Sequence, residues 1–175
     1  IKCAAKKLEE KKNLVLALDA SSACIPVYED LAKAYEAGKI SFKNIEVFTI
    51  DEYYPLDRNE LQTHYRFFKE YLFDLVDIPQ ENIHCLESNK MENVAEYCKE
   101  FDALVKSKGI DILITAGMGS NEPGSPYDSR TRVITLNYTT RVSAASDFFG
   151  VEYVPYHCIT MGIGTLMEAA KVYYL

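Results

Sequence analysis

The sequence has no segment long and apolar enough to cross a membrane, and it has no excess of positive charge. The longest apolar stretches, 13–20 and 110–118, fall well short of the ~20 residues that a transmembrane helix needs. The 19 basic and 26 acidic residues give a net charge of −7 and a pI of about 5. This charge argues against nucleic acid or an anionic membrane as the main partner. Any phosphate site must therefore be made locally, by a few residues.

The cysteines and histidines also lack the spacings that mark common sites. The 5 cysteines are odd in number and contain no C-x-x-C pair, so neither a disulfide framework nor a zinc site is predicted. The serines lack a G-x-S-x-G context, which disfavours a hydrolase elbow. No signal peptide is visible, because the first residues have the pattern of an amphipathic helix end, and the cytoplasm is the expected compartment. A chain that starts at Ile1 and stops within an expected strand is interpreted as a fragment or a trimmed protein.

Length and composition predict one globular domain over residues 1–175. The chain has 175 residues, of which 48% are hydrophobic and 26% charged, while a typical domain has about 150 residues. Apolar and β-branched runs predict strands at 14–18, 45–50, 110–116, 132–136, 158–161 and 172–175. Helical spacing predicts helices at 26–37, 61–75, 94–107 and 141–149. This alternation indicates a three-layer, Rossmann-like α/β fold with a mainly parallel sheet.

Three segments that follow predicted strands are candidates for a site: 19–24, 51–53 and 117–125. In parallel sheets, ligands bind in the crevice beyond the carboxyl ends of the strands. Asp51 directly follows an apolar strand, and shielding from water would raise its pKa toward the range useful for a general base. The alternative is that Asp51 caps the following turn. Glu52 would point elsewhere and is interpreted as structural.

The remaining polar candidates give weaker signals. Gly117 and Gly119 after a strand are similar to half of a phosphate-cradling loop, although ordinary turns explain such glycines equally well. Glu122 lies between a turn-forming asparagine and a proline, so its carboxylate has a defined direction and could act as a second acid or base opposite Asp51. His64 lies on a predicted helix and is interpreted as a surface residue.

Five collinear motifs together resemble a known family. They are Phe-Thr-Ile-Asp-Glu-Tyr at 48–53, Phe-Asp-Leu-Val-Asp-Ile-Pro at 73–79, Asn-Glu-Pro at 121–123, Ser-Arg-Thr-Arg at 129–132 and Met-Gly-Ile-Gly-Thr-Leu-Met at 161–167. Their order and spacing are similar to those of the glucosamine-6-phosphate deaminase (isomerase) family. The resemblance implies a sugar-phosphate isomerase fold, shared with 6-phosphogluconolactonase, a small sugar phosphate as substrate, and often a homo-oligomer.

The resemblance also implies roles for individual residues. Asp51 matches the base that moves a proton between the first two sugar carbons, and Glu122 matches a glutamate that works with a histidine in opening the sugar ring. Such a proton shift needs a positioned carboxylate and no metal or organic cofactor. We expect substrate binding by Ser22, Gly117 and Gly119. Some family members bind an allosteric sugar phosphate at the positions matched by Ser125 and Arg132.

The sequence departs from the family pattern at several of these places. The family's Asp-Gly-His-Ile-x-Phe segment is absent before Asn121, and with it the histidine. The phosphate loop is replaced by residues 20–24, where only Ser22 matches, and Asp19 beside it would repel a phosphate. Ser146-Asp147 replaces an expected arginine, and a later lysine segment lies beyond the last residue.

Two explanations are open. Either loops and a C-terminal segment are missing from an ordinary enzyme, which the abrupt step at Asn121 favours, or the site has diverged. The chain as written is expected to be inactive, because it lacks both the proton shuttle and cations for the phosphate. The alternatives to a deaminase are a hydrolase of the 6-phosphogluconolactonase type and a sugar-phosphate sensor without catalysis.

Overall fold

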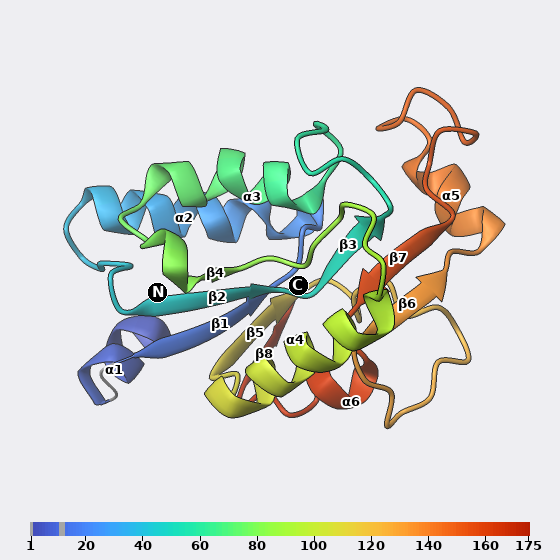
Figure 1. Ribbon diagram of the computed structural model, residues 1–175. Coiled ribbons are helices and arrows are strands. Elements are labelled where there is room, and N and C mark those ends of the chain that lie inside the picture. Colours follow the sequence, from blue (N-terminus) through green and yellow to red (C-terminus); the bar gives the residue numbers. More distant parts are fainter. Residues whose placement is uncertain (1, 11–12) are drawn as a thin grey trace.

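A five-stranded parallel sheet forms the centre of the protein (Figure 1), which a computed structural model describes over residues 2–10 and 13–175. The strand order is β4-β2-β1-β5-β8, and neighbouring strands of this sheet pair in parallel. The strands are β1 (Leu14–Leu18), β2 (Ile45–Thr49), β4 (Ile83–His84), β5 (Ile112–Thr115) and β8 (Val172–Tyr174). The expected α/β class with a mainly parallel sheet is confirmed.

Helices cover both faces of this sheet. In Figure 1, α2 and α3 lie on one face, and α4 and α6 lie on the other. The helices are α1 (Lys2–Glu10), α2 (Ile25–Glu36), α3 (His64–Tyr71), α4 (Val94–Lys108), α5 (Tyr138–Ala144) and α6 (Ile163–Leu166). No helix in the described ranges is long and apolar enough to span a membrane.

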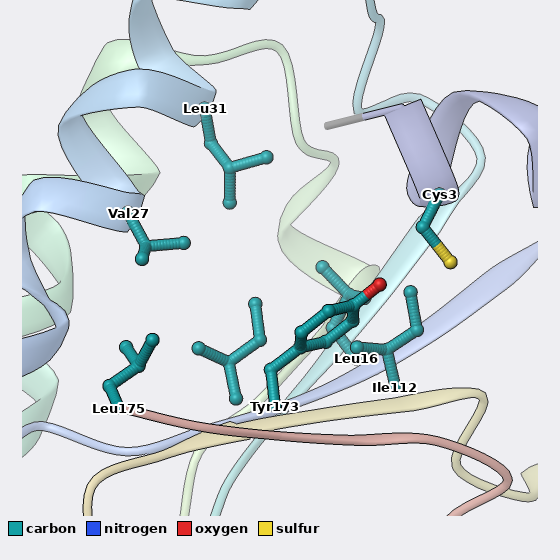
Figure 2. Close-up of a pocket in the computed structure, with 8 residues that line it drawn as sticks. Cys3, Leu16, Val27, Leu31, Ile112, Tyr173 and Leu175 are labelled. Atoms are coloured by element: carbon teal, nitrogen blue, oxygen red, sulfur yellow. The ribbon is translucent and has the colours of Figure 1, made fainter.

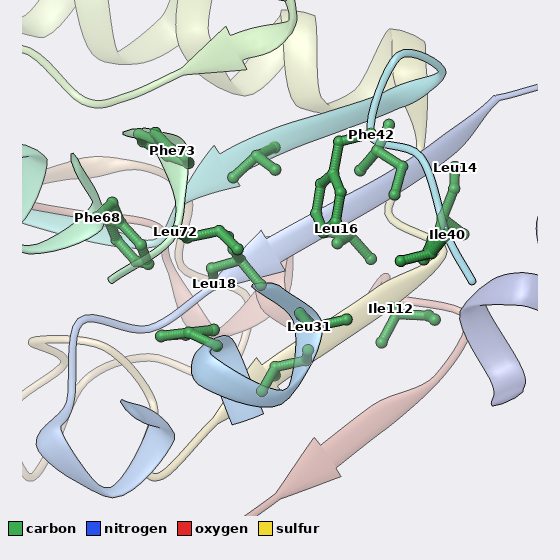
Figure 3. Close-up of a cluster of buried hydrophobic side chains, with 14 of the residues drawn as sticks. Leu14, Leu16, Leu18, Leu31, Ile40, Phe42, Phe68, Leu72, Phe73 and Ile112 are labelled. Carbon is green, nitrogen blue, oxygen red and sulfur yellow. The ribbon is translucent and has the colours of Figure 1, made fainter. Parts of the chain in front are cut away.

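The central strand β1 divides its side chains between two cores. Leu14, Leu16 and Leu18 pack in one cluster with side chains from α2 and α3 (Figure 3), and Val15 and Ala17 pack in another with side chains from α4. This division follows from the alternation of side chains along a strand. All of β1 and residues 110–115 are buried, as expected for strands covered on both faces.

A second, antiparallel sheet lies beyond the parallel one. It consists of β3 (Asp51–Tyr54), β7 (His157–Thr160) and β6 (Arg132–Thr135), with β7 in the middle. The strands predicted at 132–136 and 158–161 therefore exist, and they pair antiparallel, outside the parallel sheet. The alternation of strands and helices does not specify which sheet a strand joins, and β3, which begins directly after Ile50, was not predicted.

Ile50 connects the two sheets. Its backbone N–H donates to the carbonyl oxygen of Leu18 in the parallel sheet (3.2 Å), and its own carbonyl oxygen accepts from the N–H of Met161 (2.8 Å), which directly follows β7. The polypeptide thus passes from β2 into β3 with this single residue between them. Asp51 follows immediately, at the carboxyl end of β2.

Two predicted helices are shorter than expected. The helix predicted at 61–75 begins only at His64, because the side chain of Thr63 caps its first turn by accepting from the N–H of Arg66 (3.2 Å). The helix predicted at 141–149 ends at Ala144. Buried Arg141 donates to the carbonyl oxygens of Val151 and Val154, which holds the following segment back against α5.

Candidate active site

Asp51 forms a buried pair with His64. The Nδ1 atom of His64 lies 2.8 Å from Oδ1 of Asp51 and 2.9 Å from the backbone carbonyl oxygen of the same residue. The other carboxylate oxygen, Oδ2, accepts a 2.6 Å hydrogen bond from the hydroxyl of Ser120. Asp51 is only 6% exposed. The carboxylate is therefore held from two sides by residues that are remote in the sequence.

The pair shifts the pKa of both partners toward their charged forms. For Asp51, burial raises the pKa, but the charge of His64 and the hydrogen bonds from His64 and Ser120 outweigh it, so the pKa lies below its usual range. For His64, burial lowers the pKa, and the charge of Asp51 more than reverses this, which raises the pKa to about 10. The prediction of a raised Asp51 pKa is wrong because it considered burial without a cationic neighbour. The interpretation of His64 as a surface residue is wrong because the side chain turns inward to Asp51.

Glu52 fixes the position of His64. Its carboxylate accepts hydrogen bonds from the backbone N–H groups of Tyr53 (2.9 Å), His64 (3.0 Å) and Tyr65 (3.0 Å). The last two belong to the first turn of α3, whose N–H groups have no partner within the helix. Glu52 is 1% exposed, and burial raises its pKa above the usual range. As neighbours on one strand, Asp51 and Glu52 thus hold the side chain and the backbone of His64, respectively. Glu52 is structural, as expected.

Ser120 is part of the site although the sequence analysis did not propose it. Its N–H donates to Oγ1 of Thr160 (3.2 Å), and its hydroxyl lies 3.4 Å from Sγ of Cys158 as well as against Asp51. The preceding Gly119 has φ +58°, and a Cβ there would approach Oγ1 of Thr160 to 2.8 Å. A glycine is thus required for the turn that brings Ser120 to Asp51. In the sequence, the only signal for Ser120 is its place directly after the glycine pair Gly117 and Gly119, and that motif is weak.

A cavity of about 540 Å³ adjoins the pair. Its lining includes Ser22 from the loop after β1, His64 and Tyr53, and the segment Asp147 to Phe149 after α5. The ring of Tyr53 lies between those of His64 (centroids 5.1 Å apart) and Phe148 (4.9 Å). The cavity is large enough for a sugar-sized ligand. His64, and not Asp51, is the member of the pair that lines it.

A smaller cavity of about 130 Å³ lies on the α2 face of the parallel sheet (Figure 2). Side chains from α1, α2, β1, β5 and the C-terminal residues surround it, and they are Cys3, Leu16, Val27, Leu31, Ile112, Ile114, Tyr173 and Leu175. None of these described lining residues is Asp, Glu or His, and the Asp51–His64 pair adjoins the larger cavity instead.

The carboxylate of Asp19, directly after β1, accepts hydrogen bonds from three groups at this edge of the sheet. One carboxylate oxygen accepts from the hydroxyl of Thr115 (2.8 Å) and the N–H of Ala116 (3.0 Å), and the other accepts from the N–H of Ser21 (3.1 Å). Burial raises the pKa of Asp19, and the charge of Asp51 adds to the rise. An acidic side chain thus accepts from the N–H of Ser21, which belongs to the loop that the family resemblance assigns to phosphate.

The other predicted residues lie around this edge of the sheet. Gly117 is in the turn after β5, where its N–H donates to Oγ1 of Thr115 (3.1 Å). Both carboxylate oxygens of Glu122 accept hydrogen bonds from Asn137, one from its backbone N–H (2.8 Å) and one from its side-chain amide (2.9 Å). The pKa of the Cys158 thiol is raised, mainly by burial and further by the charge of Asp51. The charge of Glu122 also raises it, so Glu122 contributes to the electrostatic potential at the site.

The two predicted allosteric residues contact each other. Arg132 donates to the hydroxyl of Ser125 (3.1 Å) and to the side-chain oxygen of Asn121 (2.9 Å). Asn121 in turn donates to the carbonyl oxygens of Met118 and Met161. The loop that follows the glycine turn is thus tied to the antiparallel sheet, through Arg132 of β6 and Met161 after β7. Within the part of the chain that the structure describes, no group of three His, Cys, Asp or Glu side chains is placed to hold a metal ion.

The Asp51–His64 pair predicts how stability depends on pH. The pKa of His64 rises from its ordinary 6.5 to about 10 on folding, so its contribution is complete below pH 6.5 and is lost as the pH rises toward 10. We expect the difference in free energy of unfolding between the unaltered protein and His64→Asn to shrink across this window. Urea denaturation of both proteins at several pH values measures it. A difference that stays constant from pH 6 to 10 would contradict the ion pair.

Together, the fold and the site define an α/β protein with a carboxylate–histidine centre at the carboxyl edge of a parallel sheet. Comparison with known proteins shows the family to which this chain belongs. The family model described as glucosamine-6-phosphate isomerases/6-phosphogluconolactonase matches residues 1–123. The chain belongs to this family.

Individual relatives agree with this assignment. The chain is 36% identical to a glucosamine-6-phosphate deaminase of Lysinibacillus sphaericus over 95% of its own length and 73% of that protein. It is 38% identical to the deaminase of Yersinia enterocolitica over 92% of its own length, but spans only 63% of that relative. A solved monomeric glucosamine-6-phosphate deaminase superposes with a TM-score of 0.90 at 29% identity, with 98% of this chain and 73% of that one covered. A 6-phosphogluconolactonase from Thermotoga maritima shares the fold, with a TM-score of 0.70 at 23% identity over 95% of this chain and 71% of that one.

Proposed function

We propose that the protein is a glucosamine-6-phosphate deaminase, which converts the amino-sugar phosphate to a ketose phosphate and ammonia. The observation that carries this proposal is the buried Asp51–His64 pair beside a sugar-sized cavity, in a chain whose relatives are deaminases. The reaction moves a proton between adjacent carbons, and a positioned acid–base pair supplies what such a step needs. The lactonases support the fold alone.

Within this proposal Asp51 is the base that moves the proton between the first two sugar carbons, and His64 is its ionic partner. Ser22 lines the cavity and would contact the substrate. Gly117 and Gly119 shape the turn that closes the site, and Glu122 would assist ring opening from the neighbouring loop. Ser125 and Arg132, which lie farther along the same loop and β6, remain proposed ligands of an allosteric sugar phosphate.

The chain as written is expected to be inactive because it lacks a proton shuttle and cations for the phosphate. His64, however, lies beside Asp51 and is a histidine at the site. The position of Asp19 supports a weak provision for the phosphate. We therefore propose turnover that is limited by substrate binding rather than by the absence of a proton shuttle.

The test is ammonia release from glucosamine 6-phosphate by the 175-residue chain, followed in a coupled assay beside the complete gene product. Hydrolysis of 6-phosphogluconolactone without ammonia release would favour the hydrolase alternative. Binding of glucosamine 6-phosphate in a calorimeter without either product would favour the sensor. Comparable KM values for the two proteins would show that no segment beyond this chain is needed for binding.

Asp19 predicts a gain in affinity when its charge is removed. The carboxylate adjoins the loop that carries Ser22, and a like charge within several ångströms costs about 1 kcal/mol or more. We expect Asp19→Asn to lower the Kd for fructose 6-phosphate by roughly tenfold, which corresponds to about 1.4 kcal/mol. Isothermal titration calorimetry measures it. Unphosphorylated fructose is the control ligand, and its affinity should change little.

A matched control variant is Asp77→Asn. The Asp77 carboxylate also accepts a backbone hydrogen bond, from Phe42 (2.7 Å), but at the opposite end of β2. Its removal should leave the affinity for fructose 6-phosphate unchanged. An equal gain in both variants, or none in Asp19→Asn, would show that Asp19 does not face the phosphate.

The expected homo-oligomer and cytoplasmic location stay proposals. The five cysteines are free in the structure, which fits a reducing compartment. One solved relative is a monomeric deaminase, so sedimentation analysis of the protein is the direct test of its oligomeric state.

A further inference from the structure

The smaller cavity, on the α2 face of the parallel sheet, has one thiol in its lining, that of Cys3. Apart from Tyr173, the other described side chains around it are aliphatic. Figure 2 shows Cys3 on the side of the cavity opposite Val27 and Leu175. The volume of about 130 Å³ is comparable with that of apolar cavities of about 150 Å³ that hold a benzene-sized ligand. The cavity is therefore large enough for a short hydrocarbon chain attached to Cys3.

Two side chains at the start of β8 activate this thiol. The Nζ atom of Lys171 lies 3.7 Å from Sγ of Cys3 and 4.8 Å from the centre of the Tyr173 ring. A hydrogen bond from Tyr173 is the largest cause that lowers the pKa of the Cys3 thiol, and the charges of Lys171 and Lys7 also lower it. Together they outweigh burial, so this pKa lies below its usual range. Cys3 is thus a partly exposed thiol beside a cation, which is the environment of a reactive cysteine.

The other four cysteines lack this environment. Cys24, Cys98 and Cys158 are buried, and burial raises the pKa of each thiol. Cys85 is partly exposed, as Cys3 is, but burial raises its pKa to about 12. Because the thiolate is the nucleophile, a reagent that attacks thiolates is expected to react with Cys3 before Cys85.

We propose that Cys3 is a covalent modification site for short-chain α,β-unsaturated aldehydes, whose alkyl chain enters the apolar cavity. The thiol loses its proton to solvent, and Sγ forms a bond to the β carbon of the aldehyde. The electron pair of the C=C double bond passes to the carbonyl group as an enolate, and water supplies the proton that completes the α carbon. The addition releases no group and needs no oxidant.

The shape of the aldehyde matches the arrangement of the site. Its alkyl chain is attached to the β carbon, so the chain leaves from the atom that is bonded to Sγ and extends among the aliphatic side chains. The aldehyde group remains outside, toward the exposed Lys171. The larger cavity beside the Asp51–His64 pair is lined by other residues. The inference therefore goes beyond the proposed function and does not depend on it.

The rates of addition of two aldehydes with the same reactive group test the proposal. trans-2-Hexenal has two more methylene groups than crotonaldehyde, and burial of each methylene favours binding by about fourfold. We expect 2-hexenal to modify Cys3 roughly tenfold faster than crotonaldehyde, once each rate is divided by the rate with free N-acetylcysteine. Peptide mass spectrometry of the 175-residue chain, after reduction with borohydride, measures the adducts at Cys3 and Cys85 in one sample. The 2-hexenal adduct should also melt at a higher temperature than the crotonaldehyde adduct, because the seated chain stabilises only the folded state.

Lys171→Gln tests the contribution of the neighbouring charge. It should slow the addition at Cys3 by about threefold, the scale expected for two charges about 4 Å apart in water with salt. Lys99→Gln is the matched control, because Lys99 is an exposed lysine of α4, on the other face of the sheet, where it pairs with Glu96 (3.4 Å). Its rate of addition at Cys3 should equal that of the unaltered protein.

Three results would each overturn the proposal. They are equal normalised rates for the two aldehydes, modification of Cys85 as fast as that of Cys3, and an unchanged rate in Lys171→Gln. Thermal melting shows whether each variant is folded. If Lys171→Gln fails to fold, the comparison of the two aldehydes and of the two cysteines in the unaltered protein decides.

Discussion

Replacing Asp51 with Asn is expected to lower kcat for ammonia release from glucosamine 6-phosphate by about 10²- to 10⁴-fold, the range that a positioned acid–base group contributes. The change removes the negative charge that keeps His64 protonated, while an amide of the same shape stays in place. KM should change little, because Asp51 is covered by His64 and Ser120. Steady-state kinetics of both proteins measures the two constants separately.

Two controls accompany this variant. Asp77→Asn removes a carboxylate at the far end of β2 and should leave kcat unchanged. Circular dichroism should show that Asp51→Asn keeps its secondary structure. A kcat within a factor of two of the unaltered value would exclude the Asp51–His64 pair as the acid–base centre.

Replacing Glu52 with Ala is expected to reduce the free energy of unfolding by about 3 kcal/mol. The carboxylate accepts hydrogen bonds from three backbone N–H groups in a buried environment, and each buried donor left without a partner costs ~1–3 kcal/mol. The loss also releases the first turn of α3. Urea denaturation followed by circular dichroism measures the change.

Glu52→Gln and Glu29→Ala are the comparisons for this prediction. Glutamine keeps one acceptor oxygen and should recover part of the loss. Glu29 is a half-exposed residue on α2 that pairs with Lys33 (3.7 Å), and its removal should change the free energy of unfolding by less than about 0.5 kcal/mol. If Glu52→Ala were no more destabilising than Glu29→Ala, the carboxylate would not be holding α3.

Four strands of the parallel sheet were predictable because they carry a local signal, whereas the two-residue edge strand β4 was not predicted. The run at 14–18 has no polar residue, as expected for a strand covered on both sides, and the run at 110–116 is also mostly apolar. The helix α2 carries a proline, Pro26, near its start. The antiparallel sheet was not assigned because strand pairing depends on contacts between segments that are distant in the sequence. In particular, no turn residues separate β3 (Asp51–Tyr54) from the preceding strand, so the sequence does not indicate where β3 begins.

Half of the candidate site could be predicted, and the reason lies in how its residues are connected. Asp51 follows an apolar strand directly, so its place at the sheet edge is a local property. His64 and Ser120 reach it only through folding, and nothing in their immediate neighbours in the sequence indicates a carboxylate beside them. The pKa of Asp51 was predicted in the wrong direction for the same reason, because its dominant partner is remote in the sequence.

The connection through Ile50 places Asp51 at the junction of the two sheets. Because one residue separates β2 from β3, Asp51 follows the carboxyl end of a parallel strand and is also the first residue of an antiparallel one. Glu52, the next residue of β3, holds the first turn of α3 and with it the backbone of His64. The position of Asp51 therefore depends on the packing of both sheets, and that of His64 depends on the residue directly after it.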